Sequence, residues 1–216
     1  MMRAIRATLA LALLVFGTLP VRAAEQVDLL LVLASDVSRS VDAVKFQLQR
    51  DGYAAAFSNS RVLEAIQSDK NKRIAVCFVE WSGSMSQRVV IDWTLIKDAE
   101  TGRKFGDLLV EAPRSFAERT SISAGIDFSM AQLARAPYEA SRRTIDVSGD
   151  GTNNSGRDIR QVRDEALALG ITINGLVILS ETPLPWNRFA RRSPRCRRMR
   201  SSCSYTTQPG RSSRRT

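Results

Sequence analysis

The clearest signal in this sequence is Leu29-Leu30-Leu31-Val32-Leu33-Ala34-Ser35-Asp36-Val37-Ser38-Arg39-Ser40, in which an apolar run gives way to alternating polar residues. A continuous apolar run of this kind is typical of a parallel strand that is covered on both faces of a sheet. The apolar positions Val44, Leu48 and Ala55 then recur at helical spacing, which predicts a helix over residues 42–57. A strand that passes directly into a helix is the repeating unit of α/β proteins.

The rest of the body continues this alternation. Apolar segments predict further strands at residues 74–79, 89–96, 144–148 and 171–179, and helical spacing predicts helices at residues 104–110, 122–133 and 159–169. Only a short polar segment joins the strands at 74–79 and 89–96, so we expect an antiparallel hairpin whose second strand is a sheet edge. The predicted fold class is α/β: an open, mostly parallel, Rossmann-like sheet with helices on both faces and one antiparallel edge strand.

Composition excludes several kinds of site. The 216 residues contain no histidine, which excludes Ser-His-Asp and Cys-His nucleophiles and histidine-ligated zinc. The net charge of +10 is concentrated at the two ends: residues 1–24 carry +3, residues 181–216 carry +9, and the body over residues 25–180 is left at −2. We therefore expect no nucleic-acid partner for the body itself.

Residues 1–23 have the pattern of a secretory signal peptide. Arg3 and Arg6 precede an apolar stretch of 13 residues that ends at Leu19, and small residues follow up to Ala23. This stretch is shorter than the ~20 apolar residues that a spanning helix needs. We expect cleavage after Ala23, a periplasmic or secreted location in a bacterium, and no stable membrane span in the mature chain.

The other end of the chain has a different composition. After Leu184 there is no Leu, Ile or Val, and ten arginines lie within residues 181–216. We expect a domain over residues 25–184 and a disordered or aberrant Arg/Ser-rich tail over residues 185–216, which is what a frameshift in the gene would produce. The final strand and helix of the domain would then be missing, which would leave an exposed sheet edge.

Polar side chains gather where the predicted strands end. Asp36, Ser38 and Ser40 follow the first strand at a spacing of two, so a turning extended segment can direct all three toward one point. Asp150 follows a later strand, and Thr120 lies just before a predicted helix. An all-oxygen cluster of this kind suits a hard divalent cation such as Mg²⁺.

These residues carry a resemblance to the von Willebrand factor A (VWA) domain, whose metal-ion-dependent adhesion site (MIDAS) combines a D-x-S-x-S motif with a distant threonine and a distant aspartate. By position, the resemblance assigns the metal ligands to Asp36, Ser38, Ser40, Thr120 and Asp150. It implies a bound Mg²⁺ (or Mn²⁺) and a protein ligand that presents an acidic residue to the metal. The rim or second shell of the site is expected to hold Gly149, Gly151, Asn153 and Glu80.

A second resemblance is to a family of uncharacterised, secreted bacterial proteins with this fold. The matching stretches are residues 53–56, 79–81, 87–90 and 145–151. This family supports the fold and implies no particular activity.

Two other functions remain open from the sequence. Residues 149–154 also resemble the motif of haloacid-dehalogenase-like phosphohydrolases, in which Asp36 would be a nucleophile assisted by Mg²⁺. Those enzymes need an acid two residues after the nucleophile, where this chain has Ser38. Alternatively, the aspartates cap helices, the serines stabilise turns, no metal binds, and the basic tail binds nucleic acid or another anionic surface.

Overall fold

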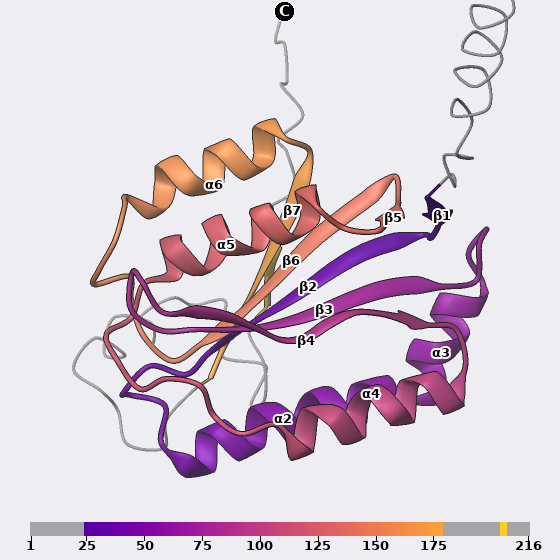
Figure 1. Cartoon of the computed structure of the whole chain (residues 1–216), viewed down its shortest axis with the longest axis horizontal. Helices are drawn as coiled ribbons and strands as arrows, with labels where there is room; N and C mark the ends of the chain where they lie inside the picture. Colours follow the sequence, from indigo (N-terminus) through magenta and orange to yellow (C-terminus); the bar gives the residue numbers. More distant parts are fainter. Residues whose placement is uncertain (1–23, 179–203, 207–216) are drawn as a thin grey trace, which may run out of the picture.

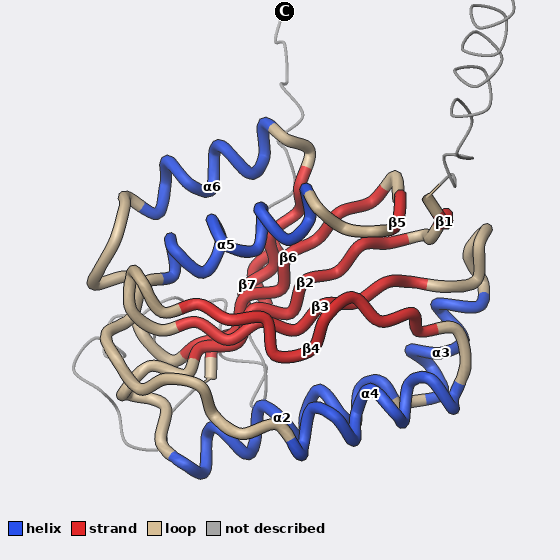
Figure 2. Tube along the Cα trace, in the orientation of Figure 1, coloured by secondary structure: helices blue, strands red, loops and turns tan. Residues whose placement is uncertain are grey.

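The computed structural model describes residues 24–178 and 204–206, which are built around a twisted six-stranded sheet (Figures 1 and 2). In spatial order the strands are β4 (Gln87–Ile96), β3 (Ile74–Trp81), β2 (Leu29–Asp36), β6 (Arg142–Gly149), β7 (Ile171–Val177) and β8 (Ser204–Thr206). Strands β3, β2, β6 and β7 are parallel, and β4 pairs antiparallel with β3 as predicted. Two short strands, β1 (Glu25–Gln26) and β5 (Tyr138–Glu139), form a separate parallel pair.

Helices cover both faces of the sheet, as the sequence predicts (Figure 1). One face carries α2 (Ala43–Phe57), α3 (Ser60–Gln67) and α4 (Ala99–Glu111), and the other carries α5 (Ile122–Ala134) and α6 (Ile159–Ala168). The sequence pattern did not reveal α3. It also placed the start of α4 too late, because α4 begins at a capping box between Asp98 and Thr101 rather than at an apolar residue.

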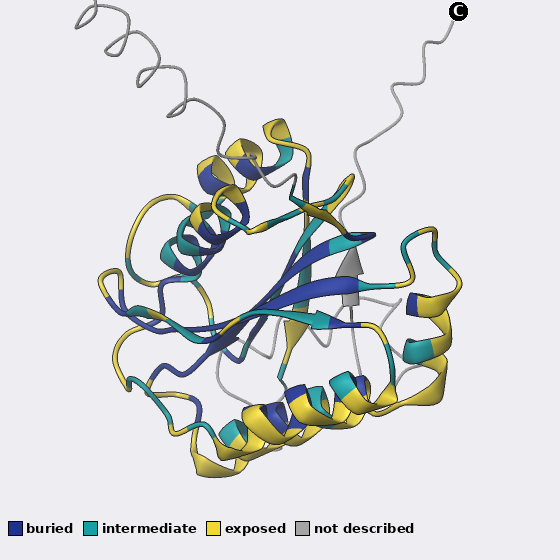
Figure 3. Cartoon of the chain, turned by 45° about the vertical axis from the view of Figure 1, so that its right-hand side comes forward, coloured by how far each residue is buried: buried dark blue, intermediate teal, exposed yellow. Residues whose placement is uncertain are grey.

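Each face of the sheet has its own hydrophobic core (Figure 3). Alternate residues of β2 supply the two cores, with Val32 packing toward the α5 side and Leu33 toward the α2 side. Seven of the eight residues of β2 are buried, as the continuous apolar run predicts for a central strand.

Helix α2 forms where the apolar spacing predicts it, but that spacing marks its outer surface. Val44 is 78% exposed and Leu48 is 61% exposed. The buried residues of α2 are instead Gln49, Arg50 and Phe57. Phe57 joins the apolar core on this face, whereas Gln49 and Arg50 make buried polar contacts with the strands.

The far edge of the sheet differs from the prediction of a single antiparallel strand. Strand β8 pairs antiparallel with β7, with Leu176 opposite Ser204 and Asn174 opposite Thr206. No apolar pattern predicts this strand, because edge pairing uses backbone N–H and C=O groups that any residue provides. The rest of the predicted tail, and the predicted signal peptide at residues 1–23, lie outside the described residues. Among the residues that are described, no helix has the length and apolar character to cross a membrane.

The connections of β2 and β6 define a crevice. These two strands are neighbours, yet β2 leads to α2 on one face while β6 leads to α6 on the opposite face (Figure 1). In open α/β sheets, ligands bind outside the carboxyl ends of strands at such a switch point. Asp36 ends β2 and Asp150 directly follows β6, so both aspartates lie at this place.

Candidate metal centre

The turn after β2 is fixed by two sets of hydrogen bonds. The backbone N–H of Ser38 donates to Oδ1 of Asp36 at 2.7 Å, which closes the turn. Nη2 of Arg114 donates to the carbonyl oxygens of Val37 and Ser38, also at 2.7 Å. These contacts hold the backbone of the turn that carries Ser38.

The five predicted ligands lie together in one hydrogen-bonded cluster. Oγ of Ser38 is 3.1 Å from Oγ1 of Thr120 and 3.2 Å from Oγ of Ser40. The Ser40 hydroxyl in turn donates to Oδ1 of Asp150 at 2.6 Å. Ser40 is exposed whereas the other four residues are buried, so the cluster opens to solvent on the Ser40 side.

Asp36 has an oxygen that the protein leaves unused. Its Oδ2 is buried and accepts no hydrogen bond from the described residues. Burial raises the pKa of the Asp36 carboxyl to about 6; hydrogen bonds from Ser38 oppose this effect and the Asp150 carboxylate reinforces it. An unpaired buried carboxylate oxygen is costly, and a bound cation is one way to compensate it.

The backbone leaves room beside this oxygen. A Cβ atom on Gly149 would lie 2.9 Å from Oδ2 of Asp36, a contact that side chains do not tolerate. The donors around it are two carboxylates and three hydroxyls, all of them oxygen, which fits Mg²⁺ or Mn²⁺. No three His, Cys, Asp or Glu side chains of the described residues form a metal-binding group, so a cation here would depend on the hydroxyls.

Lys45, which the sequence reasoning did not single out, reaches into the same cluster. Its Nζ lies 2.6 Å from Oδ2 of Asp150 and donates to the carbonyl oxygen of Ser40 at 3.1 Å. The Lys45 side chain is 13% exposed and that of Asp150 only 1%. The ion pair is therefore largely shielded from water.

Gln49 is a second polar residue that the sequence reasoning missed. Its Oε1 accepts hydrogen bonds from the hydroxyls of Ser35 and Ser148, and its Nε2 donates to the carbonyl oxygen of Asp36 at 3.1 Å. This buried side chain ties α2 to the ends of β2 and β6. It holds the two strand ends that carry Asp36 and Asp150.

Three of the four predicted rim residues lie beside the cluster. Gly149 borders Asp36, and a Cβ on Gly151 would make only ordinary contact with Thr120, at 3.8 Å. Oδ1 of Asn153 accepts from the backbone N–H of Ser123 at 3.1 Å, near the start of α5. Asn153 therefore supports the segment that carries Thr120.

Glu80, the fourth predicted rim residue, makes its contacts on the α2 side of the sheet. Its Oε1 accepts from Arg50 and its Oε2 accepts from the backbone N–H of Ser115 at 2.7 Å, so both oxygens already have partners. Side chains alternate along a strand, and Glu80 shares a face of β3 with Phe78 and Val76, on the α2 side. Glu80 belongs to a buried ion pair in that core.

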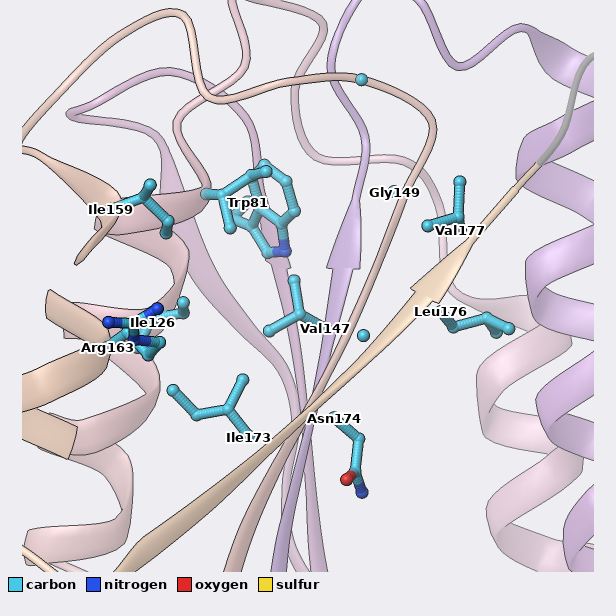
Figure 4. Close-up of a pocket in the computed structure, with 13 residues that line it drawn as sticks. Trp81, Ile126, Val147, Gly149, Ile159, Arg163, Ile173, Asn174, Leu176 and Val177 are labelled. Carbon is cyan, nitrogen blue, oxygen red and sulfur yellow. The ribbon is translucent and has the colours of Figure 1, made fainter. Parts of the chain in front are cut away.

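A separate apolar cavity of about 260 Å³ lies behind the cluster, between the sheet and the helices α5 and α6 (Figure 4). Trp81, Ile126, Val147 and Ile159 line it, and it extends to Gly149 and Gly151 on either side of Asp150. Its lining is mainly apolar, so it supplies no cation ligands.

Solved structures with the same fold include the proximal thread matrix protein 1 of the mussel byssus. That structure has a TM-score of 0.53 at 13% identity and covers 70% of this chain, which spans only 38% of the mussel protein. A second structure of it, described as having a zinc-occupied MIDAS motif, has a TM-score of 0.52 at 14% identity, with the same coverage. An aerotolerance-related membrane protein from Bacteroides fragilis has a TM-score of 0.51 at 19% identity, covering 83% of this chain and 81% of its own.

At these identities the likeness shows the fold alone, which is that of a VWA-type domain. No protein with a curated description matches this sequence. The family match is extensive: residues 26–192 fit the model of one family, and this range includes the whole cluster from Asp36 to Asp150. The chain therefore belongs to the family described as "Protein of unknown function (DUF1194)".

Proposed function

We propose that this chain is a secreted binding module that holds a divalent cation at a MIDAS-type site and uses it to bind a protein ligand. The observation that carries the proposal is the buried, unpartnered Oδ2 of Asp36 at the switch point of the sheet. Asp36, Ser38, Ser40, Thr120 and Asp150 would hold Mg²⁺ or Mn²⁺. When bound, the cation would offer a coordination position to a carboxylate oxygen of the partner.

The charge of the donor set supports an acidic partner. The cluster contains the carboxylates of Asp36 and Asp150, and Lys45 pairs with that of Asp150. A divalent cation held this way keeps a net positive charge, which favours an anionic oxygen from outside. The mussel protein with zinc in its MIDAS motif shares the fold and is consistent with a divalent cation here, although it does not identify the metal.

Calorimetric titration of the full chain with MgCl₂ and MnCl₂ tests the metal site. We expect saturable binding by the wild type and loss of binding in Asp36→Asn. Asp51→Asn is the matched control, because Asp51 is an exposed residue of α2 whose side chain accepts from Gln47 and lies outside the cluster. Equal binding by Asp36→Asn and the wild type would contradict the proposal.

A pair of peptides tests the ligand. A short peptide with a central glutamate should bind the Mg²⁺-loaded chain more tightly than the same peptide with glutamine, and the difference should vanish in EDTA.

A phosphatase assay addresses the enzyme alternative. Mg²⁺-dependent hydrolysis of p-nitrophenyl phosphate that is lost in Asp36→Asn would replace binding by phosphohydrolase activity.

A further inference from the structure

Lys45 occupies an unusual position for a lysine. It is the third residue of α2 after the N-cap Asp42, whose side chain accepts from the Lys45 backbone N–H at 2.8 Å. The N-terminus of a helix carries partial positive charge, so a cation in the first turn is unfavourable unless another interaction compensates it. Here that interaction is the pair with Asp150.

The Lys45 ammonium also fills a place that matters for the cluster. It contacts Oδ2 of Asp150 and the carbonyl oxygen of Ser40, while Oδ1 of Asp150 accepts from the Ser40 hydroxyl. Each carboxylate oxygen of Asp150 thus already has a partner, Ser40 for Oδ1 and Lys45 for Oδ2. The carboxylate oxygen that has no hydrogen-bond partner among the described residues is Oδ2 of Asp36.

We propose that Lys45 is a resident counter-ion for Asp150 and competes with the divalent cation for this carboxylate. This inference rests on the proposed function and adds a determinant of its cation affinity. A divalent cation that approaches Asp150 must displace the ammonium or bind beside its charge, and both weaken binding. The Lys45 side chain keeps a small contact with solvent, since it is 13% exposed.

The consequence is that the Lys45 side chain lowers the cation affinity of the site. Removing the positive charge while keeping the length, as in Lys45→Met, should tighten Mg²⁺ and Mn²⁺ binding by roughly tenfold or more. Lys45→Arg keeps the charge and should leave the affinity close to that of the wild type. Lys45→Gln can still donate a hydrogen bond to Asp150 without a charge, and should behave as Lys45→Met does.

The test is calorimetric titration of the full chain and these three variants with MnCl₂, with circular dichroism to verify folding. Lys104→Met is the matched control, because Lys104 also pairs with an acid, Glu100, but does so on the exposed surface of α4. Tighter binding in Lys45→Met and Lys45→Gln, with Lys45→Arg and Lys104→Met unchanged, supports the proposal. Unchanged affinity in both uncharged variants, with measurable binding by the wild type, overturns this inference and leaves the proposed function intact. Absence of binding in the wild type and in both uncharged variants overturns the proposed function as well.

Discussion

The Asp36 carboxyl is fully buried, and only one of its oxygens accepts a hydrogen bond within the described structure. Its pKa is raised to about 6, whereas in the unfolded chain it returns to the usual value near 3.8. Between these two values the folded protein binds more protons than the unfolded protein does. The metal-free protein therefore loses stability as the pH rises from about 4 to about 6, and the loss is complete above that range.

Asp36→Asn removes this penalty. At pH 7.5 and without divalent cations, we expect the variant to be more stable than the wild type by roughly 2 to 3 kcal/mol, from the size of the pKa shift. Urea denaturation at several pH values between 4 and 7.5, in EDTA, measures this. If the free energies of unfolding of the two proteins changed with pH in the same way, the Asp36 carboxylate would not destabilise the fold.

Gly149 gives a second prediction at the residue scale. In Gly149→Ala the new methyl group would lie 2.9 Å from Oδ2 of Asp36, so the carboxylate must move. We expect cation affinity to fall at least about tenfold, since a loss of about 1.4 kcal/mol already has that effect. Gly52→Ala is the control, because a Cβ at Gly52 meets nothing within 4 Å. Titration with MnCl₂ compares the two variants, and equal affinities would mean that Asp36 can adjust freely.

The residues of the site differ in how far the sequence reveals them. Asp36, Ser38, Ser40, Thr120 and Asp150 could be placed together because they follow strand ends or precede a helix, and the topology then brings them to one edge. Lys45 and Gln49 carry no motif, and isolated polar residues on a helix are normally solvated. The clue for Lys45 was its place in the first helical turn, where a positive charge is unfavourable.

At the scale of elements, the contact of α2 with β3 is an ion pair buried inside an apolar core. Arg50 pairs with Glu80, and its guanidinium lies 4.4 Å from the ring centroid of Phe78 and 5.0 Å from that of Phe46. Burial lowers the pKa of Arg50, although the Glu80 charge opposes this effect. Within the part of the chain that the structure describes, its Nε and Nη1 have no hydrogen-bond partner, so the arginine depends strongly on Glu80.

Glu80→Gln should therefore destabilise the fold by about 3 kcal/mol, because it leaves a buried charge without compensation. Glu100→Gln breaks an ion pair with Lys104 that is exposed on α4, and should have a much smaller effect because water screens that pair. Urea denaturation of both variants at one pH makes the comparison. A similar small effect for both would mean that Arg50 finds another partner.

Helix α2 also shows the limit of apolar spacing as a guide to packing. The spacing of Val44 and Leu48 correctly predicted a helix, yet these side chains face outward. The periodicity of apolar residues indicates that they form a stripe along one side of a helix. It does not say whether another element packs on that stripe. The β2 run was more informative because a strand that is apolar on both faces has to be central.

For the whole molecule, the fold class could be predicted because strands and helices alternate, and the short segment between β3 and β4 required an antiparallel pair. Strand β8 could not be predicted, since its pairing with β7 uses backbone groups alone. The net charge of +10 is likewise a poor guide to the domain, whose body carries −2. The site is better described by its local charges, two carboxylates and one ammonium.

The site joins three distant parts of the chain: the turn after β2, the segment before α5 and the loop after β6. A bound cation should therefore stabilise the fold as a whole. At a free Mg²⁺ concentration of a hundred times the dissociation constant, linkage predicts a gain of about 2.7 kcal/mol in the free energy of unfolding. Asp36→Asn should gain nothing, although it is the more stable protein in EDTA. Urea denaturation of both proteins, with and without MgCl₂, measures the difference. If Mg²⁺ stabilised both proteins equally, the cation would be acting elsewhere, since only the wild type has the Asp36 carboxylate.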